Sequence, residues 1–315
     1  MFKQTFQLPK NFYVASVQVA TVWTNPESAR EIDQLAVEDW VDMEKWLTDL
    51  SKEEKLALCD DNRVQTQVLY GEAAIVSEVK GDWAKINIPS QPSRKDEKGY
   101  PGWVPLNQLQ EVNREEWHRP ETAAIKEKHA WLEDESGEKF LKLGYMTCLP
   151  VVARGETLVE VFTPHGKAFL PRSAVEIFPT EKGGEPGNGS SIIKAGEQYL
   201  GLDYLWGGMS AFGYDCSGFA YGMHKANGYQ ISRDASDQAM HGKEIPTDEL
   251  KPGDLLFFAY EDGKGSIHHV GIYYGDGKMI HAPSTGKGIE IVSLAGTKYE
   301  RELCIARRYW EAGVV

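Results

Sequence analysis

The first part of the chain alternates between two kinds of hydrophobic pattern. Residues 12–22 are rich in β-branched and aromatic side chains, which is typical of a strand. Over residues 27–59 the apolar positions recur every three or four residues, as on one face of a helix. They are Ile32, Leu35, Ala36, Trp40, Met43, Trp46 and Leu47. Strand-like sequence returns near Val64, so the pattern predicts a β-rich unit interrupted by helices.

A weak internal repeat follows the helical segment. The first copy runs from Gly71 to Gly-Trp-Val-Pro at 102–105, and the second runs from Gly144 to Phe-Leu-Pro at 169–171. Short strands separated by glycine turns are typical of a small, strongly bent barrel. The copies differ by a polar loop at 90–99. We therefore predict two small barrels, with the helices of 27–59 inserted into the first.

The clearest linker of the chain lies at residues 179–190, where Gly and Pro dominate and apolar residues are absent. We place a boundary there, and expect units at 1–115, 116–180 and 181–315. Ser191 then fits the N-cap of a helix that continues through Leu200.

A cysteine stands at the predicted start of a later helix. Glycines crowd the approach to Cys216, and the apolar spacing over 219–224 is helical up to Asn-Gly at 227–228, a common C-terminal signal. At a helix N-terminus, unpaired N–H groups favour a thiolate over a thiol. A free cysteine is more often a buried structural residue, so both readings stand on position alone.

Two histidines are predicted to share one face of a β-hairpin. Strand-like runs flank the Gly-Asp-Gly turn at 275–277. Counted inward from a three-residue loop, Gly271 opposes His281, and His269 shares the face of Gly271. His269 and His281 are then diagonal neighbours, roughly 7–8 Å apart at Cα.

A nucleophile, a base and a group that orients the base are the parts of a catalytic triad. His269 would take the proton of Cys216 or hold it as an ion pair, and His281 would orient the ring of His269. The alternatives are two unrelated strand histidines, or a zinc site made by the same three residues. No fourth ligand stands at a metal-typical spacing, so we expect no metal and no cofactor.

Charge and composition argue against some classes of binding partner and indicate the cellular compartment. The 315-residue chain has a formal net charge of −13, which argues against a nucleic-acid or anionic-membrane partner. Its four cysteines lie far apart, as in a reducing compartment. The N-terminus does not resemble a signal peptide, and no stretch reaches the roughly 20 apolar residues of a membrane span. We therefore expect a cytoplasmic protein.

Four motifs in the last third of the chain resemble the NlpC/P60 family of cell-wall peptidases in order and spacing. They are Tyr-Leu-Trp-Gly-Gly at 204–208, Asp-Cys-Ser-Gly-Phe at 215–219, Pro-Gly-Asp-Leu-Leu-Phe-Phe at 252–258 and His-Val-Gly-Ile-Tyr-Tyr-Gly at 269–275. The two barrels resemble bacterial SH3-like (SH3b) modules. The resemblance implies an α+β fold, in which two SH3-like barrels precede a papain-like catalytic domain.

The resemblance also implies roles for individual residues. Cys216 matches the family's nucleophile, His269 its base and His281 its orienting residue. Tyr204 matches a tyrosine whose hydroxyl assists the oxyanion hole, and the backbone N–H of Cys216 is the natural second donor.

With two SH3b modules and no leader, the chain is similar to intracellular γ-D-glutamyl-L-diamino acid endopeptidases. That group implies a small murein peptide with a free N-terminal L-Ala, such as L-Ala-γ-D-Glu-diaminopimelate, as the substrate. It also implies a first module that closes the site beyond the L-Ala, and a role in cell-wall peptide recycling. We expect a monomer.

A buried ammonium needs a carboxylate or several acceptors around it. The expected substrate-binding residues are Asp215 and Asp234 in the peptidase domain, Glu72 and Tyr100 in the first module, and Trp206 and Ser217 beside the catalytic turn. A solvated loop acid, a barrel aromatic and a core tryptophan are the structural alternatives for Glu72, Tyr100 and Trp206. Arg233 is expected to be a structural or surface charge rather than a ligand of the substrate carboxylate.

Two other functions stay open at the level of sequence. The SH3b modules could do the work of a wall-binding protein whose peptidase-like domain is inactive. The same Cys–His pair could also serve a thiol amidase or acyltransferase.

Overall fold

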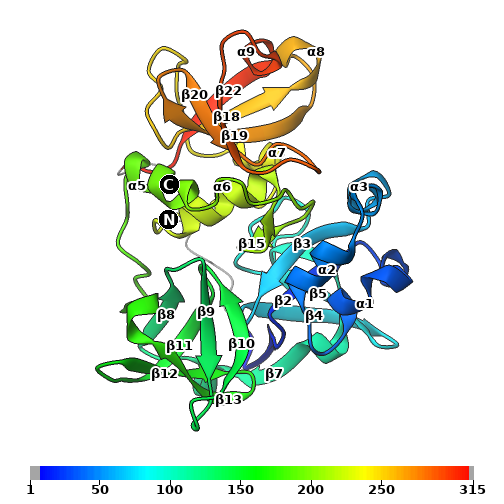
Figure 1. Ribbon diagram of the computed structural model, residues 1–315, viewed down its shortest axis with the longest axis vertical. Helices are drawn as coiled ribbons and strands as arrows, with labels where there is room; N and C mark the ends of the chain where they lie inside the picture. Colours follow the sequence, from blue (N-terminus) through cyan, green and yellow to red (C-terminus); the bar gives the residue numbers. More distant parts are fainter. Residues whose placement is uncertain (1–7, 312–315) are drawn as a thin grey trace.

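A computed structural model describes residues 8–311 and shows two β-barrels and an α+β unit packed together (Figure 1). The first barrel is a seven-stranded sheet with the order β3-β2-β6-β5-β4-β1-β7. Its strands are β1 (Asn11–Ala15), β2 (Val19–Trp23), β3 (Val64–Leu69), β4 (Ala73–Lys80), β5 (Trp83–Ile88), β6 (Tyr100–Pro105) and β7 (Leu109–Asn113).

The second barrel repeats this topology. Its strand order is β10-β9-β13-β12-β11-β8-β14, which is the first order with seven added to each strand number. Its strands are β8 (Glu121–Ile125), β9 (His129–Glu133), β10 (Lys139–Gly144), β11 (Cys148–Arg154), β12 (Leu158–Thr163), β13 (Gly166–Pro171) and β14 (Val175–Pro179). The weak sequence repeat therefore reflects two copies of one fold.

The helical segment between β2 and β3 is divided more finely than its apolar spacing predicts. It holds three short α-helices, α1 (Gln34–Val37), α2 (Met43–Asp49) and α3 (Lys52–Asp60). Asp42 and Ser51 are the N-caps of α2 and α3, and each side chain accepts a backbone N–H of its helix. Each cap therefore starts a new helix and separates it from the helix before. Trp40 is 54% exposed, although the period placed it on the buried face.

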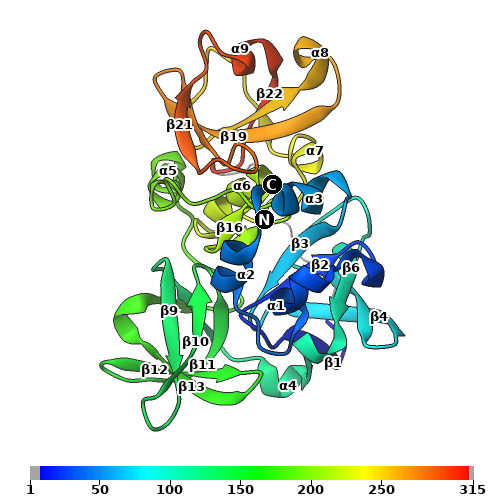
Figure 2. The same cartoon turned by 45° about the vertical axis from the view of Figure 1, so that its right-hand side comes forward.

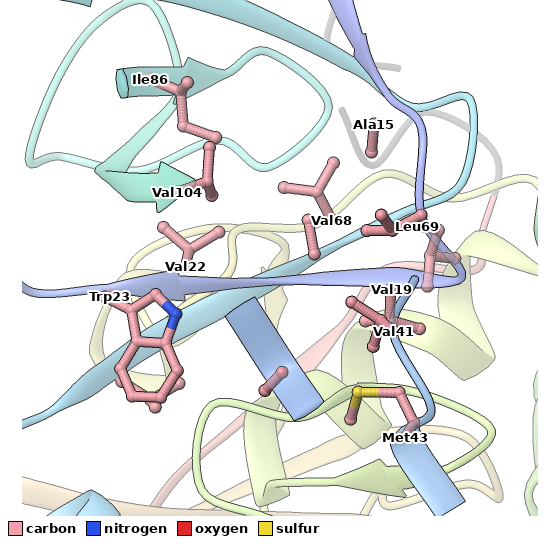
Figure 3. Close-up of a cluster of buried hydrophobic side chains, with 14 of the residues drawn as sticks. Ala15, Val19, Val22, Trp23, Val41, Met43, Val68, Leu69, Ile86 and Val104 are labelled. Atoms are coloured by element: carbon pink, nitrogen blue, oxygen red, sulfur yellow. The ribbon is translucent and has the colours of Figure 1, made fainter. Parts of the chain in front are cut away.

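The inserted segment closes the core of the first barrel. Met43 and Trp46 are fully buried there, and Trp46 lies against Trp23 with ring centroids 6.4 Å apart. Figure 3 shows Met43 and Val41 beside Val19, below the layer formed by residues of β2 and β3. The insertion is thus part of the barrel's hydrophobic core rather than an appendage.

The last unit is a six-stranded sheet with the order β17-β22-β18-β19-β20-β21, and helix α6 lies between this sheet and the barrels (Figure 1). The strands are β17 (Lys243–Glu244), β18 (Leu255–Ala259), β19 (Ile267–Gly275), β20 (Lys278–His281), β21 (Glu290–Ser293) and β22 (Leu303–Arg308). The predicted α+β architecture behind two barrels is confirmed. The remaining elements are α5 (Gly189–Glu197), the β15–β16 pair (Met209–Ser210 and Gly213–Tyr214), α6 (Cys216–Lys225), α7 (Ala235–Gln238), α8 (Tyr260–Gly263) and α9 (Lys298–Glu302).

Helix α5 begins earlier than the sequence predicts. Asn188 is its N-cap, and Ser191 is the third helical residue that completes a capping box with it. Asn and Ser are both good capping residues, and the preference alone did not distinguish them.

Edge strand β3 joins the first barrel to the catalytic unit. The Gln67 side-chain oxygen accepts the backbone N–H of Met209 at 3.0 Å, and the indole N–H of Trp206 donates to the carbonyl of Val64 at 3.0 Å. Helix α3 also reaches the catalytic unit (Figure 2), where a Cβ added to Gly286 would lie 2.8 Å from Lys52 Cε. The first barrel is therefore packed directly against the α+β unit.

A buried histidine far along α6 should make the fold sensitive to acid. His224 is fully buried with its Nδ1 2.8 Å from the carbonyl of Ala220, and burial lowers its pKa to about 4. In the unfolded chain its pKa is about 6.5. Below that pH His224 is protonated in the unfolded state, whereas in the folded state it stays neutral until the pH approaches about 4. The free energy of unfolding should therefore fall by about 2 kcal/mol between pH 7 and pH 5 through this residue.

Urea unfolding at pH 7 and pH 5 measures this effect. We expect His224→Gln to lose about 2 kcal/mol of the pH dependence seen in the unmodified protein. The exposed His118 provides the control, since His118→Gln should keep the full decrease. An unchanged pH dependence in His224→Gln would contradict the assignment.

Candidate active site

Cys216 is the first residue of helix α6, at the end of a glycine-rich turn. Asp215 is the N-cap, and its carboxylate accepts the backbone N–H of Gly218 at 2.7 Å. A Cβ added to Gly218 would lie 2.1 Å from the carbonyl oxygen of Gly208. The turn can thus pack this closely only with glycine at 218, which explains the glycines around the cysteine.

The hairpin of β19 and β20 brings His269 and His281 together as predicted. Tyr273 pairs with Met279 and Ile272 with Ile280, so the same register continued sets Gly271 against His281. The turn itself differs from the prediction, because Gly275 pairs with Lys278 and a bulge follows. The bulge adds the residue that the shorter loop removes, so the inner register is unchanged.

The two imidazoles form a direct hydrogen bond in a buried site. His269 Nε2 lies 2.7 Å from His281 Nδ1, and the side chains are 5% and 0% exposed. Gly271 lies opposite them, and a Cβ there would lie 2.5 Å from Met279 Sδ and 3.4 Å from His281 Cβ, so the side chain of Met279 is what requires glycine at this position. The ring of Tyr299 packs on both, with centroids 5.6 Å and 5.2 Å away.

Glu290 is a further member of this chain of side chains that sequence reasoning missed. It pairs with His281 across β20 and β21, and its Oε1 lies 3.6 Å from His281 Nε2. A carboxylate beside that nitrogen favours a proton on it. His281 Nδ1 is then an acceptor, and His269 donates to it from Nε2. The lone pair left on His269 is at Nδ1.

The sulfur of Cys216 lies against the backbone of the residue that follows His269. Its Sγ is within hydrogen-bonding reach of the backbone N–H groups of Val270, the residue after His269, and of Ser217. Burial, followed by the charge of Asp215, nevertheless raises the pKa of Cys216 to about 12. The helix N-terminus therefore does not produce a thiolate in the free site, because burial outweighs it.

Burial keeps both histidines neutral as well. It lowers the pKa of His269 well below its usual value, and it lowers the pKa of His281 to about 4, assisted by Lys287 and Lys298. A thiol beside a neutral imidazole is a nucleophile with a general base, rather than a preformed ion pair.

Tyr204 lies beside this group. Its side chain is 8% exposed, and burial, followed by the nearby sulfur of Cys216, raises the pKa of its hydroxyl well above the usual value. The phenol therefore stays protonated and can donate a hydrogen bond to a developing oxyanion.

Asp215 and Ser217 are bound to a buried arginine. Arg233 is 1% exposed and contacts Asp215 Oδ2 at 2.6 Å and Ser217 Oγ at 2.9 Å. Its Nε donates to Thr66 Oγ1 of strand β3 at 2.8 Å. Arg233 is a structural charge, as expected. Asp215 and Ser217 remain predicted substrate contacts whose side chains hold Arg233 in this structure.

Tyr100 and Asp234 meet across the boundary between the first barrel and the catalytic unit. The hydroxyl of Tyr100 donates to Asp234 Oδ1 at 3.0 Å. Asp234 follows Arg233 in sequence, and Arg233 bonds to Asp215, the residue that precedes Cys216. Gln65 of β3 and Lys95 complete the group, because Lys95 Nζ contacts Gln65 Oε1 at 3.1 Å and Asp234 Oδ2 at 3.2 Å.

Glu72 lies away from the nucleophile, and Trp206 lies between two hydrophobic cores. Glu72 bonds to Ser90 Oγ at 2.6 Å and pairs with Lys225 at 3.6 Å. Lys225 is the last residue of α6, at the opposite end from Cys216, so the structure does not bring Glu72 to the nucleophile. Trp206 is half-buried and packs on the cores of both the first barrel and the catalytic unit.

Known proteins are similar to this chain over nearly its whole length. Residues 201–308 match the NlpC/P60 family, and residues 125–178 match the YKFC SH3b2 domain. A gamma-D-glutamyl-L-lysine dipeptidyl-peptidase of Bacillus subtilis is 48% identical over 290 residues, which cover 92% of this chain and 96% of that protein. The chain belongs to the NlpC/P60 family.

Further NlpC/P60 relatives agree in sequence and in structure. A protein of the same name from Bacillus cereus is 37% identical and covers 93% of this chain and 89% of its own length. The crystal structure of an NlpC/P60 family protein from Bacillus cereus ATCC 10987 superposes with a TM-score of 0.91 at 36% identity, covering 95% of this chain and 99% of that one. The protein is thus an NlpC/P60 cysteine peptidase with SH3b modules.

Between residues 8 and 311, no three His, Cys, Asp or Glu side chains are arranged to hold a metal ion. Within the same range no helix is long and apolar enough to cross a bilayer.

Proposed function

We propose that the protein is a cysteine endopeptidase that hydrolyses the γ-D-glutamyl–diamino acid bond of murein peptides with a free N-terminal L-Ala. The observation that carries this proposal is the group of Asp234, Tyr100 and Gln65 near the nucleophile. A carboxylate, a phenol and an amide oxygen around one point are a good receptor for a primary ammonium. The names of the two Bacillus relatives, which specify a γ-D-glutamyl-L-lysine bond, support the same substrate class.

The receptor's position explains why the enzyme would release a dipeptide. Two of its groups, Tyr100 and Gln65, come from the first barrel, which would hold the N-terminal ammonium at a fixed distance from Cys216. An N-terminal ammonium held there allows only a short acyl segment before the reacting carbonyl. The receptor would thereby select substrates with two residues before the scissile bond, as a dipeptidyl-peptidase requires. A free N-terminus is present in a peptide fragment rather than in intact wall.

The reaction uses the chain from Glu290 to Cys216. His269 Nδ1 accepts the thiol proton as the sulfur attacks the γ-carbonyl carbon of D-Glu, and Tyr204 with the Cys216 backbone N–H stabilises the oxyanion. The proton then passes to the leaving amine as the C–N bond breaks, which leaves a thioester on Cys216. Water, deprotonated by His269, hydrolyses the thioester and restores the thiol.

Product analysis tests the proposal. Incubation with L-Ala-γ-D-Glu-L-Lys should give L-Ala-D-Glu and lysine, and the α-linked isomer should remain intact because its scissile carbonyl is displaced from the sulfur. Release of free alanine, or equal cleavage of both isomers, would contradict it. A peptide-recycling role, a cytoplasmic location and a monomeric state are further parts of the proposal.

A further inference from the structure

The polar loop between β5 and β6 has no counterpart in the second barrel, where only residues 164–165 separate β12 from β13. Its backbone is tied to the catalytic unit at two points. The carbonyl of Pro92 accepts the backbone N–H of Arg233 at 3.0 Å, and the backbone N–H of Arg94 donates to Asp237 Oδ2 at 2.9 Å. The main chain of the loop is therefore fixed beside the ammonium receptor.

Lys95 extends from this loop into the receptor. Its Nζ donates to the Tyr100 hydroxyl and to Gln65 Oε1 at 3.1 Å, and it forms an ion pair with Asp234 Oδ2 at 3.2 Å. Three acceptors match the three N–H donors of a primary ammonium. The nitrogen also lies 4.2 Å from the centre of the Tyr100 ring, within cation–π range. These contacts are the ones that the α-ammonium of a peptide substrate would require.

We propose that Lys95 is an intramolecular competitor of the substrate's ammonium: it occupies the receptor in the free enzyme and leaves when a peptide binds. This inference rests on the proposed function, because it assigns the receptor to the substrate's N-terminus. The Lys95 side chain is 40% exposed, so it can move into solvent while the loop backbone stays in place. Asp234 thus has a cationic partner both before and after binding.

Competition of this kind lowers apparent affinity without affecting the chemical step. Two ammonium groups cannot share one set of acceptors, so only the fraction of enzyme with Lys95 displaced can bind substrate, and KM rises by the reciprocal of that fraction. Once the peptide is bound, Lys95 is away from the reacting atoms. Lys95 therefore affects KM and leaves kcat unchanged.

Steady-state kinetics on L-Ala-γ-D-Glu-L-Lys tests this role. We expect Lys95→Gln to lower KM about three- to tenfold at unchanged kcat, and Lys95→Arg, which keeps a cation of similar reach, to stay near the unmodified KM. The control is Lys98→Gln, which removes the same charge from an exposed position of the same loop and should not alter KM. An unchanged or higher KM in Lys95→Gln overturns the proposal, and a higher KM would assign Lys95 to a substrate contact.

Calorimetry separates this proposal from the proposed substrate. L-Ala-γ-D-Glu is titrated into Cys216→Ala with and without Lys95→Gln. Tighter binding in the double variant supports the competitor. Equal affinity in both overturns the role of Lys95 and leaves the substrate proposal standing. Absence of binding in both removes the ammonium receptor, and with it both proposals.

Discussion

Cys216→Ala should abolish hydrolysis of L-Ala-γ-D-Glu-diaminopimelate and leave the fold intact. In the proposed mechanism the sulfur is the atom that forms the thioester. Removing the nucleophile of a hydrolase typically lowers kcat by several orders of magnitude, so we expect a loss of at least about 10,000-fold. The measurement is kcat/KM together with a thermal unfolding curve.

The control for this variant is another cysteine of the same domain. Cys304 lies on β22, where its thiol points to the carbonyl of Phe257, and Cys304→Ala should keep activity near that of the unmodified protein. Activity retained in Cys216→Ala would end the assignment of the nucleophile. If Cys216→Ala lost both its activity and its cooperative unfolding transition, Cys216 would instead be a residue that the fold requires.

Acetylating the substrate's N-terminal amine should lower kcat/KM by at least about 100-fold. The acetyl group removes the charge and two of the three N–H donors, and it adds a bulky acyl group next to Asp234 and Tyr100. Sites built to hydrogen-bond a polar group strongly reject analogues that lack it, because their buried polar atoms are left unpaired. The comparison is L-Ala-γ-D-Glu-L-Lys against its N-acetyl form under identical conditions.

Two variants identify which carboxylate recognises the amine. Asp234→Asn should lower the rate with the free-amine peptide and bring the ratio of the two substrates close to one. Glu72→Gln should leave the ratio unchanged, since Glu72 is engaged with Ser90 and Lys225. A collapse of the ratio in Glu72→Gln would show that the receptor lies elsewhere. Equal rates with both peptides in the unmodified enzyme would remove the receptor but leave the peptidase.

Local patterns in the sequence were sufficient to predict which histidines of the β19–β20 hairpin lie together. The period of two along a strand fixed which histidines share a face, and the Gly-Asp-Gly turn fixed where to start counting. The predicted pairing of the inner residues is correct despite a wrong loop length, because the bulge between Tyr273 and Gly275 restores the register. The start of α6 at Cys216 was similarly local, since a capping aspartate and close-packed glycines mark it.

The parts that sequence did not predict depend on contacts between distant segments. Lys95, Gln65 and Asp234 meet only because the first barrel docks on the catalytic unit, and nothing in the pattern around Lys95 indicates that docking. Glu72 was a plausible acid by composition, but its position is set by Lys225 on α6. The sequence also did not predict that the Cys216 thiol stays protonated. Burial raises its pKa by more than the helix N-terminus lowers it, and burial is a property of the packed structure.

The most direct test of the central claim is a crystal structure of Cys216→Ala with intact L-Ala-γ-D-Glu-L-Lys. We predict that the γ-carbonyl carbon of D-Glu lies about 3–3.5 Å from the position of the missing sulfur. The N-terminal ammonium should lie between Asp234 and Tyr100, with Lys95 displaced into solvent. A peptide bound with its Ala carbonyl at position 216, or with its ammonium away from Asp234, would contradict the account.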